Sequence, residues 1–409
     1  MNEFVVAPPL APPPTPARSH VAFANDRSGF RRLAMRGAML ELVTAGFYRF
    51  WLATDMRRHL WSHTLVDGDT AEYTGTGREL LIGFLFAVAI LGPIYLAYFI
   101  AGLEAERVRA FASFPLGLFF YLFMQFAVYR ARRYRLTRTV WRGVRFSMTG
   151  SGWNYAWRAV LWTMLAFLTL GLAQPWRLAA LERFKMRHTS YGDLQGRFDG
   201  KGSGLFKRGW WLWLVALLLI VLPIALGVTL ASHNSQGGKV IAVLAPFVIM
   251  LCLPFMYGTY KAIEWRWWVA GVAFGDVTFT SDLGRSSLFG LYWKVIGWAF
   301  LLMLIMSIVS GGVISAVAAT GRFNGMSPEQ IALTMQQVPV LVGMGLVYVV
   351  MALAIGVVVR IYLLHDLWRR VADTTTVVNL AAAENVTAQG NLVGAIGEGF
   401  ADSLDVVGF

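Results

Sequence analysis

Long apolar runs arranged in pairs constrain this chain more than any other feature. A helix needs about 20 mostly apolar residues to cross the hydrocarbon of a bilayer. Three pairs of runs have roughly that length, namely 80–103 with 113–129, 209–231 with 240–259, and 291–319 with 338–363. A short connection joins the two runs of each pair. The sequence therefore predicts three transmembrane helical hairpins.

The composition of the 409 residues agrees with a membrane location. Hydrophobic residues make up 57% of the chain and charged residues only 14%, whereas soluble domains are about 25% charged. The 16 tryptophans suit the border between membrane and water. The only cysteine, Cys252, lies inside an apolar run and excludes a disulfide framework and a cysteine-rich zinc site. We expect a polytopic, mainly α-helical membrane protein.

The basic residues predict the orientation. Seven arginines or lysines lie in 130–153 and eight in 175–208, whereas the connections inside the three pairs carry two, one and one. Because positively charged loops stay cytoplasmic during insertion, the basic linkers and the C-terminus are predicted to be cytoplasmic. A net charge of +13 also occurs in nucleic-acid-binding proteins. Here the arginines lie between apolar runs, so no nucleic-acid partner is expected.

Two shorter apolar stretches, 33–51 and 153–176, are ambiguous. The first contains Arg36 and Glu41, which are costly at the centre of a membrane. The second lies between the two most basic linkers, so a single crossing would break the charge rule. We favour re-entrant or interfacial segments over full spans, which would raise the count from six to eight. The proline-rich residues 1–29 are predicted to form a disordered tail.

An internal repeat appears when the chain is shifted by 125 residues. The matched positions are Thr44 and Thr169, Gly46 and Gly171, Trp51 and Trp176, His63 and His188, Tyr73 and Phe198, Gly75 and Gly200, and Gly77 and Gly202. Such matches at one offset without a gap indicate a duplicated unit. The predicted organisation is a tail (1–29), unit one (30–129), unit two (130–259), a linker with the third hairpin (260–363), and a cytoplasmic C-terminal tail (364–409).

Short strand-like pieces recur in the linkers. They read "TAEY", "GVRFSM", "LQGRF" and "DVTFT", and a turn with one or two glycines follows each of them. Lone strands are unstable, so we expect the four pieces to pair into a small cytoplasmic sheet. The pair Gly75 and Gly77 lacks the third glycine of a dinucleotide-binding loop. We interpret it as a hinge that turns the chain into the membrane.

The segment from Leu42 to Leu85 resembles the signature of the uncharacterised YjgN-like family of bacterial inner-membrane proteins. That signature has an apolar stretch ending in Thr-Leu-Gly-x-Tyr-x-x-Trp, then an Arg-rich helix, then Gly-x-x-x-x-Tyr-x-Gly-x-Gly before a span. Thr44, Gly46, Tyr48, Trp51 and the segment from Tyr73 to Gly77 fit it, whereas Ala173 replaces the tyrosine in the second copy. The resemblance covers nearly the whole chain from about residue 30. It implies a bacterial inner-membrane location and no established activity.

Two sets of histidines are candidates for chemistry. Asp55, His59 and His63 fall at helical spacing, and carboxylate and imidazole groups bind several divalent metals. Only His63 recurs in the second copy, so we favour a solvated helix face and expect no metal and no cofactor. His63 and His188 are either pH-sensitive groups in a vestibule or helix-terminating residues. We favour helix termination.

The arginine-rich linkers are candidates for contacts with membrane lipids. Arg130, Arg132, Arg133, Arg135 and Arg138 form the densest cluster. Basic residues beside an anionic leaflet gain about 1 kcal/mol each, so we expect contacts with anionic head groups at the cytoplasmic face. The alternatives are that these arginines only fix the topology, or that they form a site for an anionic substrate. Glu264, near the end of a span, is interpreted as a snorkelling side chain or as a partner of the C-terminal tail.

The sequence predicts the architecture in more detail than the function. Because internal repeats are frequent in transporters, the first hypothesis is transport or lipid handling through a duplicated membrane core. The alternative is a non-catalytic membrane scaffold that binds anionic lipids or partner proteins. No catalytic constellation is recognisable, so we expect no enzyme activity. Homo-oligomerisation stays open.

Overall fold

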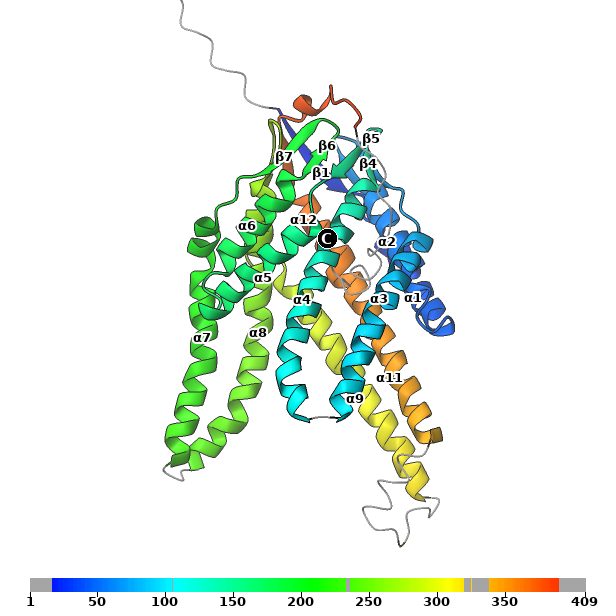
Figure 1. The fold of residues 1–409 in the computed structure, drawn as a ribbon, viewed down its shortest axis with the longest axis vertical. Helices are drawn as coiled ribbons and strands as arrows, with labels where there is room; N and C mark the ends of the chain where they lie inside the picture. The colour runs from blue at the N-terminus through cyan, green and yellow to red at the C-terminus, as the bar shows by residue number, and fades with distance from the viewer. Residues whose placement is uncertain (1–16, 105, 233–235, 320–324, 326–337, 390–409) are drawn as a thin grey trace, which may run out of the picture.

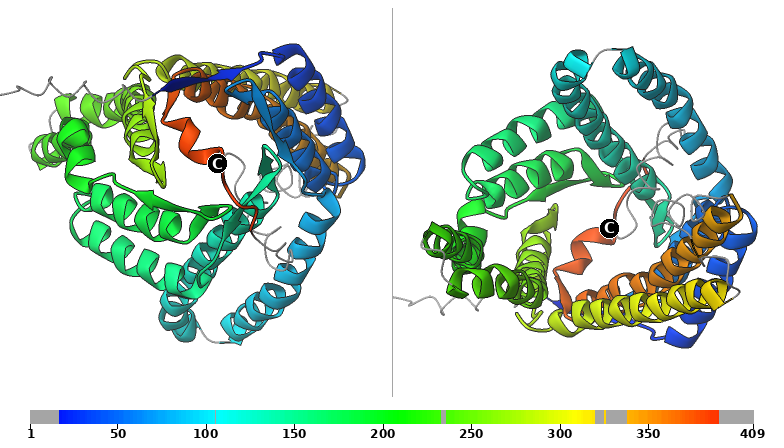
Figure 2. Two further views of the ribbon diagram at one scale, coloured as in Figure 1. Left: turned by 90° about the horizontal axis from the view of Figure 1, so that it is seen from above. Right: turned by 90° about the horizontal axis from the view of Figure 1, so that it is seen from below.

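A ring of short strands stands at one end of the molecule, and long helices extend away from it (Figure 1). The computed structural model describes residues 17–104, 106–232, 236–319, 325 and 338–389. Seen along its length, the strands and helices are arranged around a common centre (Figure 2). The fold is therefore a closed sheet that carries a circle of helices.

Ten strands form the ring. They are β1 (Arg18–Phe23), β2 (Thr64–Val66), β3 (Asp69–Tyr73), β4 (Thr139–Trp141), β5 (Val144–Met148), β6 (Thr189–Tyr191), β7 (Leu194–Phe198), β8 (Val272–Phe274), β9 (Val277–Ser281) and β10 (Thr375–Val378). Every neighbouring pair is antiparallel, and β1 closes the barrel by pairing with β10 on one side and β2 on the other. No edge of this ten-strand ring stays open among the described residues, which removes the tendency of exposed edges to aggregate.

The helices come in pairs. They are α1 (Arg27–Val43), α2 (Arg49–Ser62), α3 (Gly77–Glu104), α4 (Glu106–Thr137), α5 (Gly152–Leu168), α6 (Gln174–Arg187), α7 (Gly202–Ser232), α8 (Gln236–Gly271), α9 (Phe289–Ala319) and α11 (Val338–Val359). The π-helical η1 (Arg360–Asp366) and α12 (Leu367–Asp373) continue from α11, and the 3-10 helix η2 (Leu380–Ala383) follows β10.

The element order recurs along the described chain. A helix pair followed by a β hairpin forms a module, and α1–α2–β2–β3, α3–α4–β4–β5, α5–α6–β6–β7 and α7–α8–β8–β9 are the first four. In the fifth, α9 and α11 with η1 and α12 lead to β10, which pairs with β1 from the other end of the chain. The helices α2 and α6 begin 125 residues apart, as do α3 and α7. The offset found in the sequence therefore spans two modules.

Five of the six predicted runs lie in helices that are long and apolar enough to cross a membrane. These helices are Gly77–Ile100, Gly202–Gly227, Leu244–Gly271, Phe289–Gly312 and Gly345–Asp373. Their apolar side chains are largely exposed, as lipid-facing surface requires. The sixth run, 113–129, lies in α4, which is not among the five candidates. The described residues therefore support a membrane protein with five candidate spans.

The two ambiguous apolar stretches are short helical hairpins. In the first, α1 ends at Val43 and α2 begins at Arg49; in the second, α5 ends at Leu168 and α6 begins at Gln174. Neither stretch is one continuous helix, so neither forms the single uninterrupted span that was the alternative. The tips are apolar and open, with Val43 and Phe167 each 83% exposed.

The four predicted strands are present as β3, β5, β7 and β9, but the sheet is larger than expected. Each of them is the second strand of a hairpin whose first strand has only three residues, too few to give a sequence pattern. The prediction of a disordered tail through residue 29 is wrong for its last part, because β1 and the start of α1 occupy it. Residues 1–16 lie outside the described part.

Two glycines allow long helices to start against the short helix pairs. A Cβ atom on Gly77, the first residue of α3, would lie 2.7 Å from the Cα of Trp51 in α2. A Cβ on Gly202, the first residue of α7, would lie 2.8 Å from the Cα of Trp176 in α6. The matched Trp and Gly positions thus make the same close backbone contact in two parts of the chain.

We expect Gly77→Ala and Gly202→Ala to destabilise the protein by about 1–3 kcal/mol each, the usual cost of overpacking. The clash is with backbone, which cannot move aside as a flexible side chain would. Thermal unfolding of the purified protein in detergent measures the effect. Gly204→Ala is the matched control, because a Cβ on Gly204 in the same helical turn meets nothing within 4 Å. Equal stability of all three variants would contradict this account.

Candidate functional site

The repeated motif residues shape the turns and helix ends of the modules. Gly46 and Gly171 have φ of +89° and +87° and end the first helix of each short pair. Their amides donate to carbonyls five residues earlier, at 2.7 Å in both cases. The rings of Tyr73 and Phe198 lie over Gly75 and Gly200, where a side chain would collide with them. Glycine is therefore required for shape at these turns.

The matched histidines terminate helices. His63 is the C-cap of α2 and His188 is the C-cap of α6. In each, Nδ1 lies 2.7 Å from the carbonyl oxygen four residues earlier, that of His59 or Phe184. This is the geometry that the helix-termination interpretation requires. Neither histidine lines the central cavity formed by the described residues.

A cavity of about 570 Å³ lies at the centre of the molecule, between the strand ring and the long helices. All five helix pairs contribute to its wall, through α2, α4, α6, α8, and α9 with η1. Its cationic side chains are Arg49, Arg57, Arg132, Arg135, Lys185, Lys261 and Arg360. Its acidic side chains are Glu182 and Glu264. This excess of positive charge in a recess attracts anions.

One carboxylate in the wall holds two of the cations. Glu182 in α6 lies 3.4 Å from Arg132 of α4 and forms a salt bridge with Lys185 one turn away. Its side chain is 12% exposed. Burial by itself raises the pKa of a carboxyl, but Lys185 and Arg132 outweigh it and lower the pKa of Glu182. Glu182 is therefore ionised and fixes α6 against α4.

Two further ion pairs order the wall. Arg360 of η1 contacts Glu41 of α1 at 2.7 Å, and Glu41 is 4% exposed. The carboxylate that is costly inside a membrane is thus neutralised by a partner 319 residues away. Lys261 and Glu264 pair at 2.9 Å within α8. The snorkelling interpretation of Glu264 is wrong, because this side chain lines the cavity.

The arginine cluster of α4 divides between different environments. Arg132 and Arg135 line the cavity, and Arg138 forms an ion pair with Glu79 of α3 at 2.5 Å. None of the five arginines is exposed, Arg130 and Arg133 included. Three of the five arginines, Arg132, Arg135 and Arg138, therefore direct their charge toward other parts of the protein, and the contact with lipid head groups stays a prediction.

Apolar and aromatic side chains complete the wall. Trp61, Trp265, Trp268, Tyr257, Tyr292, Leu52, Met56, Leu60, Leu136 and Leu364 are among them. Trp61 stacks on Trp368 with ring centroids 5.1 Å apart, and its indole N–H donates to Thr139 at 3.0 Å. A cavity with cationic and aromatic walls can hold a molecule that has an anionic end and an apolar body.

Two of the three candidate metal ligands from the sequence lie together, and Asp26 takes the place of the third, Asp55. Asp55 pairs with Arg58 at 3.5 Å, whereas His59 and His63 lie beside Asp26, which follows β1. The helical spacing identified both histidines. It missed Asp26, because that residue is 33 positions before His59 and approaches only when β1 pairs with β2.

Comparisons with known proteins give one family. The family model described as a bacterial protein of unknown function, DUF898, matches residues 18–403. No curated protein and no solved structure matches the chain significantly.

We expect Glu182→Gln to lower the free energy of unfolding by about 3–5 kcal/mol, because the change leaves two buried cations without their carboxylate. Urea titration in detergent measures it. Asp199→Asn, which breaks the exposed pair with Arg197, is the control and should cost less than about 1 kcal/mol.

The ion pairs of Glu182 also predict that the stability of the protein depends on pH in the acidic range. The pKa of this carboxyl is lower in the folded protein than the value of 4.5 expected for the unfolded chain. Its stabilising contribution is therefore complete above that pH and disappears as the pH falls through the folded-state pKa. Glu182→Gln should lack this component of the pH–stability profile, and an identical acid limb in both proteins would contradict the assignment.

Proposed function

The chain belongs to the DUF898 family of bacterial proteins of unknown function, and we propose that it binds an anionic amphiphile in the central cavity as part of transport or lipid handling. The observation that carries this proposal is the wall of seven cationic and two acidic side chains, to which all five helix pairs contribute. A ligand at that position contacts every module of the protein.

Phosphate is the anion that the wall suits best. Five of the seven cations are arginines, whose planar guanidinium groups bind phosphate and carboxylate oxygens in pairs. The cavity is partly closed, so its charges are less screened than those on an open surface. A phosphate-bearing head group or a small organic phosphate meets these requirements, and the two differ in whether an apolar chain is needed.

The position of the cavity favours the lipid-like form. Its wall includes five residues between 257 and 268 of α8, and Tyr292 of α9, which lie at the ends of candidate spans nearest the strand ring. Lipid head groups occupy this level of a membrane. The tryptophans and tyrosines in the wall are also the residues preferred at the membrane border.

Further parts of the proposal rest on the sequence. The strand ring and the basic linkers face the cytoplasm of a bacterial inner membrane, as the distribution of arginine and the YjgN-like signature imply. The offset of 125 residues arose by duplication, which supports a site where modules meet. Membrane lipids are the expected partners, and for the cavity we propose no nucleic-acid partner, no cofactor and no catalytic activity. Self-association is compatible with this account.

One observation favours the alternative of a non-catalytic membrane scaffold. The pairs of Arg132 with Glu182, Lys261 with Glu264 and Arg360 with Glu41 occupy several of the cavity cations. Paired cations attract a ligand less strongly. If the cavity serves only to join the helices, lipid binding will not depend on its charge.

We expect Arg49→Gln and Arg57→Gln to weaken binding of phosphatidylglycerol by about fivefold each, because each removes about 1 kcal/mol of attraction. Native mass spectrometry of the protein with phosphatidylglycerol, phosphatidylcholine or inorganic phosphate measures this. The matched control is Arg58→Gln on the same helix, since Arg58 points away from the cavity and contacts Gly75 and Asp55. Equal retention by cavity and control variants would support the scaffold instead.

The orientation can be tested with single cysteines in a Cys252→Ser background. Asp276→Cys lies in the exposed turn between β8 and β9, and Thr229→Cys lies near the far end of α7. A membrane-impermeant thiol reagent should label position 276 only from the cytoplasmic side and position 229 only from the opposite side. The reverse pattern would overturn the orientation.

A further inference from the structure

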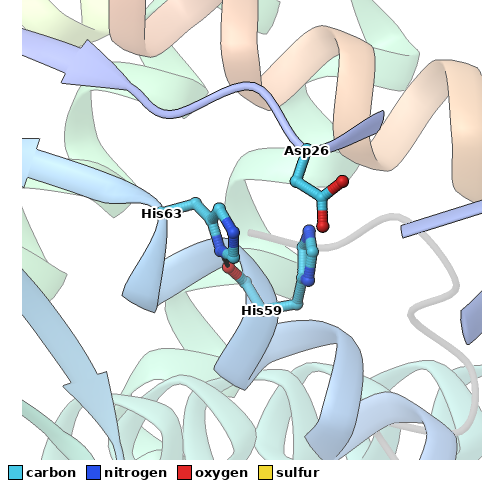
Figure 3. A group of neighbouring side chains, drawn as sticks. All are labelled: Asp26, His59 and His63. Carbon is cyan, nitrogen blue, oxygen red and sulfur yellow. Dashed lines mark hydrogen bonds between the residues drawn. The ribbon is translucent and has the colours of Figure 1, made fainter. Parts of the chain in front are cut away.

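Three potential metal ligands meet where the chain closes its strand ring. Asp26 lies between β1 and α1, His59 in the last turn of α2, and His63 directly before β2 (Figure 3). One ligand atom from each of the three lies within 4.8 Å of the others. In Figure 3 the Asp26 carboxylate points toward the His59 ring, and the two imidazoles lie face to face. Their centroids are 4.1 Å apart.

The hydrogen bond of His63 selects the nitrogen that remains for a metal. His63 Nδ1 lies 2.7 Å from the backbone carbonyl of His59, which only accepts, so Nδ1 carries the proton. The lone pair is then on Nε2. Metal-binding histidines commonly donate their second ring N–H to a backbone carbonyl in this way. The orientation of the ring is thus fixed before any ion arrives.

His59 supplies the second nitrogen. Its Nε2 is shielded from solvent and has no hydrogen-bond partner in the described part of the chain. A shielded polar atom without a partner is costly, and an ion would satisfy it. Burial lowers the pKa of His59, and His63 lowers it further.

Asp26 supplies the carboxylate. Its Oδ1 accepts the Gly29 amide at 2.9 Å and the Ser28 hydroxyl at 3.1 Å, so this side chain caps α1. These two bonds lower the pKa of Asp26. The group is ionised at neutral pH and held in place by the helix that it caps. Phe23 and Phe30 pack close to the histidines and form an apolar border.

We propose that Asp26, His59 and His63 bind one divalent transition-metal ion of the zinc class, with water completing the coordination. Two imidazoles and one carboxylate are a donor set that such ions accept. Bonds of about 2.0–2.2 Å in a tetrahedral site separate the ligand atoms by about 3.4 Å. Because the two imidazoles are stacked, the His59 ring must turn out of this stack for both nitrogens to face one ion. This inference does not rest on the proposed function.

The ion would act as a clamp on the ring. The strands β1 and β2 pair through Phe23 and Thr64, and the amide of Ala24 donates to the carbonyl of His63 at 2.8 Å. The ligands lie directly beside these bonds. Metal binding therefore ties the N-terminal strand to the first module at the point where the barrel is closed.

The third module provides an internal comparison. There His188 makes the same bond to the carbonyl four residues earlier, but Phe184 stands at the position of His59. That module has the helix-terminating histidine without a second imidazole. Helix termination therefore accounts for His63 but not for the second imidazole, His59.

The test uses the full-length protein in detergent, prepared without a polyhistidine tag and stripped with chelator. Titration with Zn²⁺ or Co²⁺, read by equilibrium dialysis and by the visible spectrum of Co²⁺, should show one ion per chain. Asp26→Asn should bind at least about tenfold more weakly, while Asn still caps α1. His59→Phe, which copies the residue at the equivalent position of the third module, should lose the site.

His188→Gln is the matched control and should keep the affinity of the unchanged protein. Zn²⁺ should raise the unfolding temperature of the unchanged protein and of His188→Gln, but not that of Asp26→Asn or His59→Phe. Absence of a stoichiometric ion would overturn the proposal. Binding that persists in both Asp26→Asn and His59→Phe would overturn it as well. Neither result bears on lipid binding in the central cavity.

Discussion

Closure of the strand ring is the constraint on which the rest of the structure depends. Most of the strands have three to five residues, and strands of that length are unstable alone or in isolated hairpins. Each becomes stable by pairing on both sides, so the hairpins depend on one another around the circle. Because every hairpin follows a helix pair, the closed ring also fixes where the helices stand.

The ring brings separated charges together. Glu41 and Arg360 come from opposite ends of the chain and meet because β1 and β10 are neighbours. Arg132 and Glu182 meet because their modules are adjacent. Burying such charges is costly unless they are paired, which accounts for the carboxylates in the wall. The cations outnumber the acidic residues in the wall, so the cavity carries a net positive charge.

Local patterns in the sequence predicted the parts that depend on local physics. Apolar runs predicted six spans, five of which lie in helices long and apolar enough to cross a membrane, and strand-like pieces before glycine turns predicted β3, β5, β7 and β9. The first strand of each hairpin was missed because three residues carry no period. Arg132 and Arg135 were assigned to lipid contact because only the assembled ring shows that they face inward. Asp26 was missed for the same reason, since it reaches the histidines through strand pairing.

The two proposed sites depend on the ring in different ways. The Asp26 cluster lies at one seam, between β1 and β2, and a metal there strengthens a single junction. The cavity lies at the centre, where every module contributes a wall. The contacts of a ligand in the cavity therefore depend on the positions of all five helix pairs. Because ring closure holds the modules in place, an ion at the seam stabilises the frame within which the cavity binds its ligand.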